Sequence, residues 1–150
     1  MSLAMTGGGA AYEFRWRRWA LLRDCVVHHL EDDQPGSRFP LFFLIGSALG
    51  GRSLMLSPGP LASELRQIQE GMRGLGVEAL MLGPETASVL YPSIRGVSAP
   101  RPLSEAERRD AGVADSSSSL ADHFGVFFSS ALEVCQRAEE ALLQVEVIDL

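Results

Sequence analysis

Residues 38–45 form the densest apolar run of the chain and constrain its fold most strongly. They read Arg-Phe-Pro-Leu-Phe-Phe-Leu-Ile, with a glycine close to each end of the run. A short apolar run between turn residues is typical of a strand that is buried on both faces. The residues expected in the middle of a sheet are Phe39, Leu41, Phe43 and Ile45, or their alternates Phe42 and Leu44.

Three amphipathic segments supply the helices that such a strand needs as cover. Residues 18–31, 61–72 and 120–142 each repeat apolar side chains at a spacing of three to four residues, which is the period of an α-helix. The combination predicts a single α+β domain, in which a small mixed sheet of three to five strands packs against about three main helices.

Shorter patterns predict the remaining organisation. Residues 1–11 are rich in glycine and alanine, and we expect a disordered leader there. A charged mini-helix is expected at residues 104–110, inside a long loop at 92–119 that contains the serine run 116–119. Alternating or short apolar segments predict further strands at residues 12–16 and 144–148, and a strand or extended segment at 54–56. Residues 77–82 could form a strand or the start of a buried helix, and their short length favours a strand.

The charge distribution bears on possible partners. The formal net charge is −6, and all thirteen basic residues are arginine. Arg15, Arg17, Arg18 and Arg23 lie close to Trp16 and Trp19, a combination that could stack and neutralise a nucleic acid. Because proteins that bind phosphate backbones are usually basic, we favour a helix that buries its tryptophans and exposes its arginines to solvent. No nucleic-acid partner is expected.

The chain offers little for redox or metal chemistry. Cys25 and Cys135 both fall in predicted helices, where a thiol is usually a small buried group, so no disulfide is expected. Cys25, His28 and His29 lie close together but lack a second pair at zinc-binding spacing. We predict no metal, no cofactor and no catalytic set, and no apolar run is long enough to cross a membrane.

Residues 46–53 match the phosphate-binding loop apart from one position. They read Gly-Ser-Ala-Leu-Gly-Gly-Arg-Ser, where Arg52 replaces the lysine of that motif. The motif works by opening a helix whose N-terminus faces the phosphates, and Pro58 prevents a helix that begins at Ser53 from extending. We interpret the segment as a flexible turn.

The order of motifs resembles immunity proteins of bacterial polymorphic toxin systems. The resemblance lies in His-Leu-Glu-Asp at residues 29–32, Gly-Ser-Arg-Phe-Pro at 36–40, and the helix start Ser57-Pro58 that precedes Leu61, Leu65 and Ile68. It continues in Ser-Leu-Ala-Asp-His-Phe at 119–124, followed by a long helix and a short final strand. In place of acidic residues, the loop at 47–52 is glycine-rich.

The resemblance implies a cytoplasmic protein that binds and neutralises a cognate toxin without being an enzyme. Binding would rest on exposed carboxylates that meet a basic patch, and the candidate partner-binding residues are Glu31, Asp32, Asp33 and Arg52. The alternatives are a small-ligand-binding or enzymatic domain that uses the glycine-rich turn at 46–53, and an adaptor that binds through residues 92–119.

Overall fold

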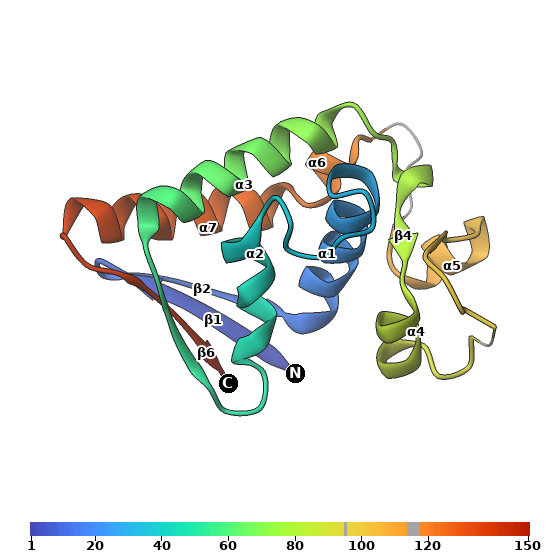
Figure 1. The fold of residues 1–150 in the computed structure, drawn as a ribbon, viewed down its shortest axis with the longest axis horizontal. Helices are drawn as coiled ribbons and strands as arrows, with labels where there is room; N and C mark the ends of the chain where they lie inside the picture. Colours follow the sequence, from blue (N-terminus) through green and yellow to red (C-terminus); the bar gives the residue numbers. More distant parts are fainter. Residues whose placement is uncertain (95, 114–117) are drawn as a thin grey trace.

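A four-stranded antiparallel sheet forms the base of the molecule (Figure 1). The computed structural model describes residues 1–94, 96–113 and 118–150. The strand order is β2-β1-β6-β3, so the two ends of the chain pair in the middle of the sheet. The predicted α+β class is confirmed, although the described strands pair only in antiparallel fashion, not in a mixed sheet. The strands are β1 (Ser2–Gly7), β2 (Ala10–Arg15), β3 (Ser53–Leu56) and β6 (Val145–Asp149).

The expected disordered leader is wrong, because residues 2–7 are the central strand β1. Leu3 and Met5 are completely buried, and β1 pairs with both β2 and β6. The glycines that suggested disorder make a tight hairpin instead. Gly8 has a φ of +58°, and a Cβ built there would lie 2.1 Å from the Arg137 carbonyl oxygen. Only glycine allows the hairpin to approach the helix so closely.

Helices α1 (Trp16–Leu30), α3 (Pro58–Arg73) and α7 (Gly125–Glu140) are the three main helices. α7 packs on β1 and β2, and α3 lies along α7 (Figure 1). The predicted stripe of α3 is confirmed, since Leu61, Leu65, Ile68 and Met72 are all fully buried. The predicted last helix is divided by Phe124 into α6 (Leu120–His123) and α7, and Ser119 caps α6 by accepting a hydrogen bond from the Asp122 N–H.

The strand expected at residues 38–45 is wrong. This run forms α2 (Pro40–Leu44) and the 3₁₀ turn η1 (Ile45–Ala48). Phe39, Phe42 and Ile45 are buried at a spacing of three residues, whereas Phe43 is 37% exposed. Pro40 starts the helix, where its missing N–H costs nothing. The Glu64 carboxylate on α3 accepts the next N–H groups, those of Leu41 and Phe42.

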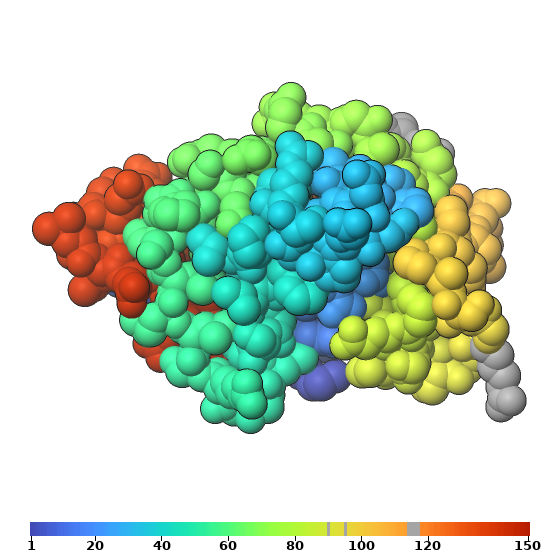
Figure 2. Space-filling model, in the orientation of Figure 1, coloured from blue at the N-terminus to red at the C-terminus, as the bar shows by residue number. Residues whose placement is uncertain are grey.

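Residues 77–113 form small elements at one end of the molecule (Figure 2). The strand predicted at 77–82 is only partly confirmed, because a 3₁₀ turn precedes β4. The loop expected at 92–119 contains a strand and the predicted mini-helix, whose capping box joins Ser104 and Glu107. Residues 116–117 of the serine run lie outside the described residues. The elements are η2 (Val77–Ala79), β4 (Met81–Leu82), α4 (Pro84–Leu90), β5 (Arg101–Pro102) and α5 (Glu105–Asp110).

None of the helices formed by residues 1–94, 96–113 and 118–150 is both long and apolar enough to cross a bilayer.

Replacing neighbouring phenylalanines tests the helical assignment of residues 40–44. Phe42 is 1% exposed, so Phe42→Ala should lower the free energy of unfolding by about 3 to 5 kcal/mol. Phe43→Ala removes a half-exposed ring and should cost no more than about 1.5 kcal/mol. Urea denaturation of both variants gives the comparison, and equal losses would contradict the helix.

Candidate functional site

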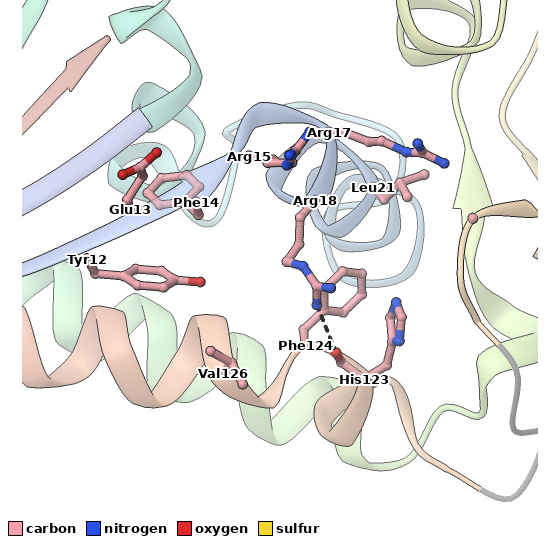
Figure 3. Close-up of a pocket in the computed structure, with 11 residues that line it drawn as sticks. Tyr12, Glu13, Phe14, Arg15, Arg17, Arg18, Leu21, His123, Phe124 and Val126 are labelled. Atoms are coloured by element: carbon pink, nitrogen blue, oxygen red, sulfur yellow. Dashed lines mark hydrogen bonds between the residues drawn. The ribbon is translucent and has the colours of Figure 1, made fainter. Parts of the chain in front are cut away.

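A cleft of about 510 Å³ lies where β2 runs into α1, opposite the junction of α6 and α7 (Figure 3). We call it the arginine cleft, because three of its lining side chains are guanidinium groups. Its lining residues are Tyr12, Glu13, Phe14, Arg15, Arg17, Arg18, Leu21, Ala111, His123, Phe124 and Val126.

The three arginines come together because strand β2 passes directly into helix α1. Arg15 ends the strand, and Arg17 and Arg18 lie in the first helical turn. The Arg18 Nη1 donates a hydrogen bond to the His123 carbonyl oxygen at 3.3 Å, which joins α1 to α6 (Figure 3). The Arg17 Nε donates to the Tyr91 hydroxyl at 3.1 Å.

The positive charge of the arginine cleft is poorly compensated. Among the described residues, no carboxylate lies within ion-pair distance of Arg15, Arg17 or Arg18. Helix α1 has no acidic residue in its first turn and no side-chain cap. Because a helix N-terminus already carries partial positive charge, cations there oppose the helix dipole. The local field therefore favours an anionic group, and Glu13 is the only carboxylate among the described residues that line the cleft.

The other polar lining groups are neutral near pH 7. Burial raises the pKa of the Tyr12 phenol, and the nearby Arg18 charge opposes this effect only in part. Burial, and to a smaller extent Arg18, lowers the pKa of His123. Tyr12 and Phe14 stack with their ring centroids 5.3 Å apart, so the cleft combines aromatic walls with guanidinium groups.

The acidic partner site predicted at residues 31–33 is not a continuous surface. Glu31 is only 4% exposed, and its carboxylate accepts hydrogen bonds from the N–H groups of Gly36, Arg38 and Phe39 at 3.3, 2.9 and 3.0 Å. It is a structural residue that holds the turn before α2. Asp32 and Asp33 are exposed and adopt left-handed backbone angles of 49° and 60° in φ.

Arg52 does not join those acids, contrary to expectation. The loop that follows α1 and the loop that follows η1 lie at opposite ends of α2 (Figure 1). The N–H groups of the glycine-rich turn already have a hydrogen-bond partner. Those of Gly50 and Gly51 donate to one carboxylate oxygen of Asp149 at 3.0 and 3.1 Å. Strand β3 follows the turn where a phosphate-binding loop needs a helix.

The thiols and imidazoles considered as ligands have structural surroundings. Burial raises the pKa of Cys25 to about 12 and that of Cys135 to about 11, so both remain protonated thiols. His28 contacts the Asp33 carboxylate at 3.0 Å, and His29 contacts the Ala79 carbonyl oxygen at 2.8 Å. Within the part of the chain that the structure describes, no three His, Cys, Asp or Glu side chains are grouped to hold a metal.

Sequence patterns only partly indicated the arginine cleft. The arginines near Trp16 and Trp19 were the available signal, and both tryptophans are buried as expected. Arg23 departs from that expectation: it is buried and donates to the Thr86 hydroxyl at 2.8 Å. The contribution of His123 and Val126 had no local signal, because they follow β2 by more than 100 residues.

Paired substitutions test the structural role assigned to Glu31. Glu31→Gln retains the shape but weakens three hydrogen bonds to a buried charge, and should lower the free energy of unfolding by about 1 to 3 kcal/mol. Asp33→Asn, on the exposed side of the same turn, should change it by no more than about 0.5 kcal/mol. Chemical denaturation measures both, and an unchanged Glu31 variant would contradict the anchoring role.

A single substitution tests whether the glycine-rich turn can bind a nucleotide. Arg52→Lys completes the phosphate-binding motif, yet Asp149 still occupies the two N–H groups. We therefore expect neither the wild type nor this variant to gain thermal stability with ATP or GTP and magnesium. Differential scanning fluorimetry measures the effect, and a rise of several degrees in Tm would restore the nucleotide-binding alternative.

Comparison with known proteins provides no relative from which a role could be transferred. No family model matches the chain, and neither a curated protein nor a solved structure matches it. The arginine cleft and the resemblance in the order of motifs are therefore the basis for assigning a function.

Proposed function

We propose that this protein binds and neutralises a cognate bacterial toxin, and that the arginine cleft is the docking site. The protein acts by binding its partner and not by catalysis. It does so in the cytoplasm of the cell that makes the toxin. The resemblance to immunity proteins supports the toxin as partner. The chemistry of the arginine cleft supports the location.

The observation that carries the proposal is the group of three guanidiniums that form no ion pair with any described carboxylate, in a protein of net charge −6. Arginine and tyrosine are frequent anchors at the centre of protein interfaces, since each combines a polar end with a large contact area. Arg17 already lies over the Tyr91 ring, with its guanidinium carbon 4.9 Å from the ring centroid. Val126, at the rim, is 67% exposed and offers an apolar contact.

The proposed docking chemistry is the reverse of the one expected from sequence. With Glu31 buried, the exposed acids Asp32 and Asp33 make a small patch, whereas the arginines line a cavity. We therefore place the carboxylates on the partner. A nucleic acid is a poorer occupant, because the net negative charge repels it and both tryptophans are buried away from stacking.

Co-expression with the product of the adjacent upstream gene tests the proposal. We expect that product to be toxic alone, to be harmless beside this protein, and to co-purify with it. The double variant Arg17→Glu/Arg18→Glu should lose protection and weaken binding by about 30-fold or more, as expected for anchor residues. Its Tm should stay nearly unchanged, because acids suit the first turn of a helix.

The matched control is Arg66→Glu/Arg73→Glu, which makes the same charge change on the exposed surface of α3. It should protect as well as the wild type. If the upstream product is not toxic, or remains toxic and does not co-purify, the immunity function should be abandoned. If both double variants fail equally, net charge and not the arginine cleft controls binding.

A further inference from the structure

The arginine cleft runs along the free edge of the sheet. β2 is an edge strand, paired on one side with β1. Four consecutive residues of β2 line the cleft, from Tyr12 to Arg15. Because successive side chains point to opposite faces of a strand, a cavity that touches all four must lie beside the strand and not over one face. Figure 3 shows Tyr12 and Glu13 on opposite sides of this strand.

Two backbone hydrogen bonds determine which backbone groups point out of that edge. The Leu150 N–H donates to the Ser2 carbonyl oxygen, so the main chain of Ser2 faces β6. Ser2 stands opposite Arg15 of β2. Because the Ser2 main chain faces β6, these two residues exchange no ladder hydrogen bonds. The next residue, Trp16, follows the same alternation, because its N–H faces β1 and donates to the Met1 carbonyl oxygen at 3.1 Å.

The alternation of an antiparallel ladder then assigns the remaining groups. Phe14 faces β1, whereas the N–H and C=O of Glu13 and the N–H of Arg15 point outward. Among the described residues, these three groups have no hydrogen-bond partner. An edge with unpaired donors and acceptors at a two-residue spacing is a template for another strand.

We propose that the free edge of β2 binds an extended acidic segment of the partner protein as an added strand. This inference rests on the proposed function and specifies how the partner docks. The segment pairs its backbone with Glu13 and Arg15, while its carboxylates meet Arg15, Arg17 and Arg18. The four lining residues of β2 span about 13 Å, which fits a strand of about four residues.

An added strand would use backbone groups of the cleft that a small anion would leave unpaired. A free anion needs the guanidiniums but not the outward N–H and C=O groups of Glu13. A strand uses both, and β-strand addition takes affinity from the backbone and specificity from side-chain pockets. Alternate side chains of the added strand can then contact the aromatic wall at Tyr12 or the exposed Val126.

A model peptide tests the inference without the toxin. The probe is an acetylated, amidated hexapeptide that alternates glutamate and valine, added to ¹⁵N-labelled protein at low salt. We expect the amide signals of Glu13 and Arg15 to shift and their hydrogen exchange to slow. A peptide with lysine in place of glutamate, and one N-methylated at each valine, should both bind at least 10-fold more weakly.

Two substitutions at one position separate charge from backbone pairing. Arg15 has a φ of −77°, which proline also adopts, and the preceding residue is in a strand. Arg15→Ala removes the guanidinium, and Arg15→Pro removes the outward N–H as well. Arg15→Pro should bind the peptide about 2- to 10-fold more weakly than Arg15→Ala, as expected for one hydrogen bond.

The outcomes distinguish this inference from the proposed function. Equal binding by the two Arg15 variants, or by the N-methylated peptide, would overturn strand addition. So would an absence of shifts at Glu13 and Arg15 with the acidic peptide, or stronger shifts there with single-stranded oligothymidine. If the peptide results hold but the upstream product is not neutralised, strand docking stands and the immunity function fails. If this protein neutralises the upstream product but the Arg15→Pro variant protects fully, the immunity function stands and strand docking fails.

Discussion

The fold depends on an aromatic cluster centred on Phe127 of α7. Its ring lies 5.3 Å from Phe14 and 6.4 Å from Phe42, and Phe42 lies 5.8 Å from Trp19. Four separate elements, β2, α2, α7 and α1, thus meet through a chain of ring contacts. Such pairs contribute about 0.5 to 1.5 kcal/mol each beyond the area they bury. The cluster also fixes the face of β2, because Phe14 can point inward only if Glu13 and Arg15 do not.

Two carboxylates, one buried and one half-buried, determine the conformation of the segment before and within α2. Glu31 and Glu64 together accept the N–H groups that this segment cannot satisfy internally. Burial raises the pKa of Glu64, partly offset by those hydrogen bonds. Two acids that look like surface charges in the sequence are therefore needed to satisfy the backbone. This is the physical reason that Glu31 does not form one exposed acidic surface with Asp32 and Asp33.

The start of α1 departs from the usual electrostatics of a helix. Cations in the first turn typically cost about 0.3 to 1 kcal/mol, and this helix has arginine at two first-turn positions and immediately before them. A sequence that departs from such a local rule without gaining stability elsewhere is expected to do so at a functional site. Arg17 and Arg18 each donate one hydrogen bond at the edge of the cavity, and Arg17 also lies over the Tyr91 ring. Binding an acidic strand there would turn that local cost into affinity.

The sequence by itself determined the elements whose signal is local. The stripes of α1 and α3, the short strands at β2, β3 and β6, and the capped α5 all follow from side-chain period and end residues. Tertiary structure decided the rest. The glycine-rich start became a central strand because its partner β6 lies at the other end of the chain. The run 38–45 became helical because Glu64 on α3 supplies its cap. The arginine cleft needed α6 and α7 to close it, and contacts between residues so distant in sequence leave no periodic pattern to read.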